Sequence, residues 1–230
     1  MESDVLAGRL ARVRERIEAA RGRAGRTDAV TLVAVTKTHP PEVVRAAIAA
    51  GVADVGENRV QELAAKVDAV GRAAVRWHLI GHLQRNKVGK ALPLFDLLHS
   101  LDSVRLAQAL SAEAVKTGAT VRALVEVNSV GEESKEGLPA AEAIDAVGQM
   151  AALPGLELLG MMTMAPFTDD EAVIRRAFRT TRELSAQAAR QVPGFRAEHL
   201  SMGMSNDFEI AVEEGATLVR VGSSIFGERG

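Results

Sequence analysis

The chain has 230 residues, enough to bury a sizeable core as one large domain or two small ones. Its 47% hydrophobic and 25% charged residues exclude a disordered protein. The formal net charge of -2, the absence of tyrosine and the single tryptophan argue against a nucleic-acid-binding protein. The absence of cysteine excludes disulfides, thiolate metal sites and thiol nucleophiles.

The first predicted element is an amphipathic helix over residues 3–24, whose apolar residues recur at spacings of three and four. A short β-branched run over residues 31–36 predicts the first strand, and Pro40 and Pro41 then begin a helix. Further strands are predicted at 53–56, 77–81, 96–100, 121–128, 156–163, 199–202 and 218–222. Helices are predicted between them at 42–50, 58–71, 84–91, 103–117, 139–151, 169–190 and 206–214.

Eight predicted strands alternate with helices, at about 29 residues per unit, which is near the size of a βα repeat. This alternation requires a parallel sheet covered by helices, and eight units favour a closed (β/α)8 TIM barrel over an open doubly wound sheet. Residues 223–230 are too few for a full last helix, and in a closed ring the extra N-terminal helix can fill that gap. We therefore predict a single α/β domain over residues 1–230.

Polar residues follow the predicted strands, where barrels of this kind place their active sites. Lys37 follows a wholly apolar strand. The other lysines are interpreted as solvated helix positions, at Lys66, Lys87, Lys90 and Lys116, or as a loop residue, at Lys135. A desolvated lysine amine is neutral and nucleophilic, which suits it to form a Schiff base. The alternative is a strand-end lysine whose ammonium group simply reaches solvent.

Two late loops, at residues 201–207 and 220–227, combine glycine, serine hydroxyls and a predicted helix start, which are features of phosphate-binding loops. For Gly222 and Ser223 a phosphate site is favoured over an ordinary helix cap, whereas for residues 201–205 both interpretations remain open. The lysine and these loops would face each other across the closing seam of a barrel. Together they would hold a phosphorylated aldehyde, of which pyridoxal phosphate (PLP) is the prime example.

The chain resembles the YggS/PROSC family of pyridoxal phosphate homeostasis proteins over nearly its whole length. The segments that carry the resemblance are AVTKTHP (34–40), GENRVQE (56–62), WHLIGHLQRNK (77–87), VNSVGEESKEGL (127–138), GMMTMAPF (160–167) and the run over 200–227. The family is similar to the barrel domain of alanine racemase and lacks the second, β-rich domain of that enzyme. The resemblance implies that PLP is the cofactor and that it is held as an aldimine on Lys37.

The resemblance also implies a set of cofactor-binding residues. They are Lys37, Asn58, Ser201, Gly203, Met204, Arg220, Gly222 and Ser223. Ser201, with the backbone of Gly222 and Ser223, would bind phosphate, and Gly203 and Met204 would shape the same wall. Arg220 would face the pyridine nitrogen and Asn58 would lie near the ring. The role of His82 stays open, and His39, His78, His99 and His199 show no metal-ligand spacing, so no metal is predicted.

A non-catalytic role is preferred, in which the protein stores, buffers or delivers PLP inside the cell. Related racemases use a lysine and a tyrosine as their two bases, and this chain has no tyrosine. An arginine beside the ring nitrogen also opposes its protonation, which weakens the cofactor as an electron sink. The alternatives are a PLP-dependent amino-acid racemase and a colourless Schiff-base aldolase that acts on a phosphorylated sugar.

The expected partners are PLP and PLP-dependent apoenzymes as acceptors, without nucleic acid or membrane. A monomer is expected because the domain that pairs racemase subunits is missing. The acidic start without an apolar run predicts no secretory signal, and no stretch approaches the roughly 20 apolar residues of a membrane span. These features together favour a cytoplasmic location.

Overall fold

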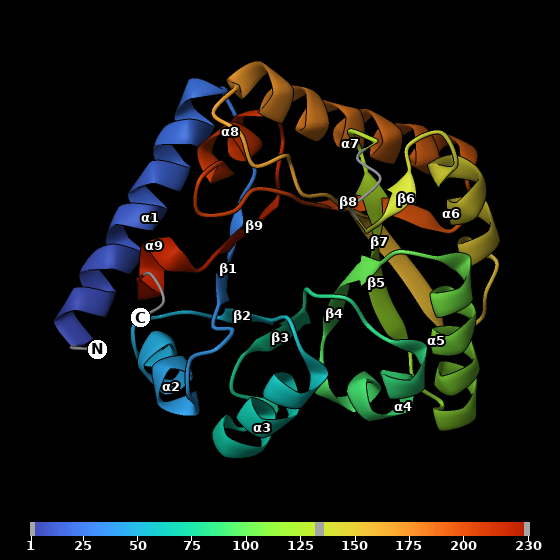
Figure 1. Ribbon diagram of the computed structural model, residues 1–230, viewed down its shortest axis with the longest axis horizontal. Coiled ribbons are helices and arrows are strands. Elements are labelled where there is room, and N and C mark those ends of the chain that lie inside the picture. The colour runs from blue at the N-terminus through green and yellow to red at the C-terminus, as the bar shows by residue number, and fades with distance from the viewer. Residues whose placement is uncertain (1–2, 132–135, 228–230) are drawn as a thin grey trace.

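A computed structural model describes residues 3–131 and 136–227, and its central feature is a closed barrel of parallel strands (Figure 1). The strands of the ring are β1 (Thr31–Val35), β2 (Asp54–Glu57), β3 (Arg76–Leu79), β4 (Leu97–Leu101), β5 (Val121–Asn128), β7 (Leu156–Met162), β8 (Phe195–Ser201) and β9 (Leu218–Val221). Pairing of β1 with β9 and of β4 with β5 closes the ring. A two-residue strand, β6 (Leu138–Pro139), pairs with β5 outside the ring. The predicted eight-stranded barrel is confirmed.

Helices surround the ring in chain order (Figure 1). They are α1 (Ser3–Arg23), α2 (Pro41–Ala49), α3 (Val60–Val70), α4 (Val88–Ala91), α5 (Val104–Thr117), α6 (Ala143–Ala151), α7 (Glu171–Gln191), α8 (Phe208–Glu213) and α9 (Ser223–Phe226). The helix predicted over 84–91 is instead the short α4 between two 3-10 turns, Arg85–Lys87 and Leu92–Leu94. Pro93, which lacks a backbone N–H, lies in the second of these turns and prevents α4 from continuing. Over the described residues, no helix has the length and apolar character needed to cross a membrane.

The N-terminal helix α1 packs against α8 and α9, beside the seam where β1 meets β9 (Figure 1). Its Arg16 Nη2 lies 2.7 Å from Glu209 Oε2, and its Arg23 Nε lies 2.6 Å from Glu213 Oε1. The last helix, α9, has only four residues. The first helix therefore fills the space that the short last helix leaves, as the sequence predicted.

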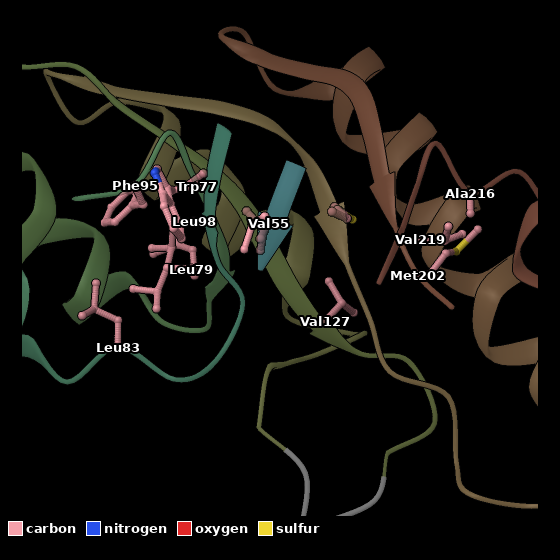
Figure 2. Close-up of a cluster of buried hydrophobic side chains, with 14 of the residues drawn as sticks. Val55, Trp77, Leu79, Leu83, Phe95, Leu98, Val127, Met202, Ala216 and Val219 are labelled. Atoms are coloured by element: carbon pink, nitrogen blue, oxygen red, sulfur yellow. The ribbon is translucent and has the colours of Figure 1, made fainter. Parts of the chain in front are cut away.

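Two apolar layers hold the barrel together. The larger lies between the strands and the helices, and Figure 2 shows part of it, with Trp77 and Leu79 on β3 and Leu98 on β4. The smaller cluster comprises Val33, Leu97, Leu124, Leu159, Met162 and Leu218, from five strands of the ring. Alternate residues of a strand share a face. Arg220, two residues beyond Leu218 on β9, therefore lies on the same face as this smaller cluster.

One strand begins earlier than predicted. The strand expected at 199–202 is β8, which starts at Phe195 and ends at Ser201. Arg196 and Glu198 in its first half are exposed and form an ion pair with each other, and Arg196 also pairs with Glu157 of β7. The sequence pattern that predicts a buried parallel strand is a continuous apolar run. The charged residues interrupt such a run, so the first half of β8 was not predicted.

Candidate functional site

A cavity of about 640 Å³ opens at the carboxyl ends of the strands, a volume typical of small-molecule sites. Loops after β1, β2, β7, β8 and β9 contribute to its walls. Six of the eight predicted cofactor-binding residues line it, namely Lys37, Asn58, Met204, Arg220, Gly222 and Ser223. The barrel thus brings together residues that are up to 186 positions apart in the sequence.

Lys37 stands at the carboxyl end of β1, where the backbone turns sharply. The next residue, Thr38, has a φ of 67°, a left-handed conformation that is unusual for a β-branched residue. The Thr38 backbone N–H donates to Glu62 Oε2 at 2.8 Å, which holds this turn against α3. Such conformations cost about 1 to 3 kcal/mol and cluster at functional sites, where the surrounding structure enforces them.

Directly behind Lys37 lies a buried ion pair. The Lys66 side chain, only 4% exposed, places Nζ 2.6 Å from Glu57 Oε1 and 2.7 Å from the Thr36 carbonyl oxygen. The Thr36 hydroxyl donates to the same carboxylate oxygen. Burial raises the pKa of Glu57 above its ordinary value, although the hydrogen bonds from Lys66 and Thr36 oppose this. The pair braces the end of β1 from the α3 side.

The prediction that Lys66 is solvated is therefore wrong. Within α3, Val60, Leu63 and Val67 are buried, and Lys66 lies on the same stripe, three residues after Leu63. Its flanking apolar spacing was a signal that could have revealed the burial. The long lysine side chain reaches across to Glu57 because only a charged partner compensates for an ammonium group removed from water.

On the other side of the cavity, the loops after β8 and β9 meet. The Ser205 hydroxyl oxygen accepts backbone N–H groups from Gly222 at 3.3 Å and Ser224 at 3.4 Å. Two backbone donors therefore converge on one oxygen at the cavity wall. Ser205 itself lines the cavity. Because the Ser205 oxygen accepts both bonds, its own hydroxyl proton can be donated to an acceptor in the cavity, such as a phosphate oxygen.

Ser201 and Gly203, by contrast, do not line the cavity. The Ser201 side chain is fully buried, and its Oγ lies 2.8 Å from His99 Nδ1 and accepts a hydrogen bond from Arg220 Nη1 at 2.6 Å. Gly203 lies behind the wall with a φ of 93°, and a Cβ there would be 2.5 Å from the Ala211 Cβ. The predicted loop thus contributes Met204 and Ser205 to the cavity, whereas Ser201, the last residue of β8, lies inside the barrel.

Arg220 reaches the cavity from within the barrel. Besides Ser201, its guanidinium donates from Nη2 to the Thr163 carbonyl oxygen at 3.0 Å. Burial lowers the Arg220 pKa to about 10, although Glu126 and Asp207 act in the opposite direction. The group therefore remains a cation at neutral pH. A guanidinium has five N–H donors, so these two bonds leave donors for a ligand.

His82, whose role the sequence left open, lies beside this cavity. His82 is half-exposed, with Nδ1 2.8 Å from Asp102 Oδ2, and lines a neighbouring cavity of about 450 Å³ that shares Asn58. Phe167, 94% exposed, stands at the rim of the main cavity. Lys135 lies outside the described residues. Among residues 3–131 and 136–227, no group of three His, Asp or Glu side chains is arranged to hold a metal ion.

Comparison with known proteins places these observations in a family. A family model described as the alanine racemase N-terminal domain matches residues 9–230. The pyridoxal phosphate homeostasis protein of Aquifex aeolicus is 42% identical over 222 residues, which cover 96% of this chain and 97% of that protein.

Two solved structures show the same barrel. PipY of Synechococcus elongatus, with PLP bound, aligns with a TM-score of 0.85 at 36% identity, over 96% of this chain and all of PipY. An alanine racemase of Clostridium difficile in complex with cycloserine aligns with a TM-score of 0.80 at 15% identity, over 98% of this chain and 60% of the racemase. The chain therefore belongs to the pyridoxal phosphate homeostasis protein family, whose barrel is that of the alanine racemase N-terminal domain.

Proposed function

We propose that this protein binds PLP in the 640 Å³ cavity and stores, buffers or delivers it without robust catalysis. The observation that carries the proposal is the meeting of Lys37, Arg220 and the Ser205–Gly222 contact around one cavity. A primary amine, a cation and the hydroxyl-bearing loops after β8 and β9 match the aldehyde, ring nitrogen and phosphate of PLP. The PLP-bound structure of PipY, at 36% identity, supports the same ligand.

Each end of the cofactor has a candidate partner in the chain. Lys37 Nζ would add to the aldehyde carbon of PLP and form an imine, with loss of one water molecule. The Ser205 hydroxyl and the backbone of Gly222 and Ser223 would bind the phosphate, so Ser205 takes the role that the family resemblance implied for Ser201. Arg220 would face the pyridine nitrogen, and Asn58 would lie near the ring.

The residues around the cavity favour holding the cofactor over using it. Bound PLP supplies an electron sink for carbanions, and this sink is strongest when its ring nitrogen is protonated. Arg220 stays cationic and donates hydrogen bonds, so it opposes that protonation. The chain also has no tyrosine to serve as the second base of a racemase. Names of the relatives as homeostasis proteins agree with this role.

Borohydride reduction tests the attachment. Protein incubated with PLP should acquire a visible imine absorption band, and reduction followed by peptide mapping should place a pyridoxyl group on Lys37. Lys37→Ala should lose the band and the label. Lys116→Ala, at an exposed position paired with Glu113, should retain both. A label confined to Lys135, or no band in the unmodified protein, would overturn the assignment.

Two activity measurements test the non-catalytic role. Incubation of the loaded protein with a panel of single-enantiomer amino acids should produce no robust interconversion of enantiomers. Addition of a PLP-dependent apoenzyme should transfer the cofactor and restore the activity of that enzyme. Rapid racemisation would contradict a carrier, and retention of all PLP in the presence of apoenzyme would contradict delivery.

A further inference from the structure

A line of polar side chains crosses the interior of the barrel and ends at Arg220. His99 Nδ1 lies 2.8 Å from Ser201 Oγ, His99 Nε2 lies 2.8 Å from His78 Nδ1, and His78 Nε2 lies 3.0 Å from Asp54 Oδ1. These four residues come from β2, β3, β4 and β8 and are all less than 5% exposed. Together with Arg220 they form a continuous hydrogen-bonded series, here called the barrel chain.

Both ends of the barrel chain have a fixed hydrogen-bonding role. Arg220 carries only donors. Asp54 accepts from Arg76 Nε at 2.6 Å and from Arg76 Nη2 at 2.7 Å, a two-pronged contact that favours the carboxylate. Burial acts to raise the Asp54 pKa, but the hydrogen bonds from His78 and Arg76 outweigh it and the pKa lies below its ordinary value. Asp54 is therefore an acceptor at neutral pH.

These ends determine the direction of every bond between them when the imidazoles are neutral. Ser201 Oγ accepts from Arg220 and donates its proton to His99 Nδ1. His99 must then carry its own proton on Nε2 and donate to His78 Nδ1. His78 in turn carries its proton on Nε2 and donates to the Asp54 carboxylate. The reverse direction would place the bare His78 Nε2 lone pair 3.0 Å from a carboxylate oxygen, which is repulsive.

We propose that Asp54, His78, His99 and Ser201 are positioning residues that form a one-directional hydrogen-bonded chain and hold the Arg220 guanidinium in a fixed orientation at the base of the cavity. In this direction each imidazole, when neutral, is the Nε2–H tautomer. Complete burial keeps the His99 pKa well below its ordinary value, and the neighbouring His78, Arg220 and His199 act in the same direction. A second cation beside Arg220 is thereby avoided.

The barrel chain gives the site a means of controlling ring protonation, an inference that rests on the proposed binding of PLP. Arg220 has two anchors in the barrel, the Ser201 hydroxyl and the Thr163 carbonyl oxygen. Its remaining donors can face the ring nitrogen only while this orientation is maintained. Because the Ser201 anchor is oriented by His99, and His99 by His78, the geometry at the ring depends on residues that never touch the cofactor.

Nitrogen NMR of the protein without PLP tests the direction of the chain. In ¹⁵N-histidine protein at neutral pH, two-bond ¹H–¹⁵N spectra distinguish the two neutral tautomers from the doubly protonated ring. Signals of the five histidines can be assigned with single His→Gln variants. We expect His78 and His99 both as Nε2–H tautomers. A proton on Nδ1 of either ring, or a doubly protonated His78, would overturn the proposal.

A matched pair of serine variants tests the link to Arg220. Ser201→Ala removes the donor to His99 Nδ1 and one anchor of Arg220. Ser111→Ala removes another buried serine hydroxyl, which donates to the Pro154 carbonyl oxygen away from the cavity. In PLP-loaded protein, Ser201→Ala should shift the pH midpoint of the imine absorption band, and Ser111→Ala should leave it unchanged. An unshifted midpoint in folded Ser201→Ala would overturn the positioning role.

The two arms separate this inference from the proposed function. The tautomer measurement uses protein without cofactor, so it remains decisive even if borohydride places no label on Lys37. Conversely, a labelled Lys37 combined with Nδ1–H tautomers would leave PLP binding intact and remove the barrel chain as the device that orients Arg220. His199→Gln serves as a further control, because His199 is half-buried near the chain but forms none of its four bonds.

Discussion

Replacement of Glu126 by glutamine should change how the stability of this protein depends on pH. Glu126 lies on β5 with 3% of its surface exposed. Burial raises its pKa from the ordinary 4.5 to about 7, and the negative charges of Asp102 and Glu136 act in the same direction. Arg220 and His82 oppose the shift without cancelling it. The carboxyl group is thus about half protonated in the folded protein at neutral pH.

The sign and size of the effect follow from proton binding in the two states. Between pH 4.5 and pH 7 the folded protein holds this proton more tightly than the unfolded chain, so the free energy of unfolding falls as the pH rises. Since one pKa unit corresponds to about 1.4 kcal/mol, the interval from 4.5 to about 7 gives a loss of about 3 kcal/mol. The loss is complete above about pH 7. Glu126→Gln is uncharged throughout and lacks this contribution.

Urea denaturation at pH 4.5 and pH 8 measures the effect. We subtract the unfolding free energy of the unmodified protein from that of Glu126→Gln at each pH. This difference should rise by about 3 kcal/mol from pH 4.5 to pH 8. Any fixed cost of burying the amide cancels in this comparison. The control Glu183→Gln, at an exposed position of α7, should show no such change. Equal pH dependence in Glu126→Gln and the unmodified protein would refute a buried, destabilised carboxylate.

Two further substitutions test features of the barrel wall. Lys66→Met leaves the Glu57 carboxylate buried without its ion-pair partner and should lower the unfolding free energy by about 3 to 5 kcal/mol, whereas exposed Lys90→Met should change it by less than about 0.5 kcal/mol. Equal losses would contradict the ion pair behind Lys37. Gly160→Ala places a Cβ 1.9 Å from the His199 carbonyl oxygen at a φ of 147°, and thermal melts should show a loss of at least about 3 kcal/mol. The control is Gly148→Ala, in α6 with open space around it, which should be neutral or stabilising. A Gly160→Ala variant as stable as the unmodified protein would contradict the close approach of β7 and β8.

The sequence alone predicted the barrel and several of the residues that line its cavity. Apolar runs separated by helix-length segments predict a parallel sheet, and the eight repeats indicate closure. The same local pattern identified Lys37, because a charge directly after an apolar strand lies where parallel strands end. It also identified the loops that contain Ser205 and Gly222, since glycine and serine there are local signals that need no long-range information.

Only the tertiary structure decided which polar side chains enter the barrel. Parallel strands are covered on both faces, so their sequences lack the alternation that would distinguish an inward from an outward residue. His78, His99 and Ser201 are therefore ordinary strand residues in the sequence, yet ring closure joins them across separations of 21 and 102 positions. Lys66 lies on a helix, and although its apolar neighbours indicate the buried side of α3, they do not identify Glu57 as its partner. Whether a charged residue is buried depends on a partner that another part of the chain supplies, and no local pattern specifies that partner.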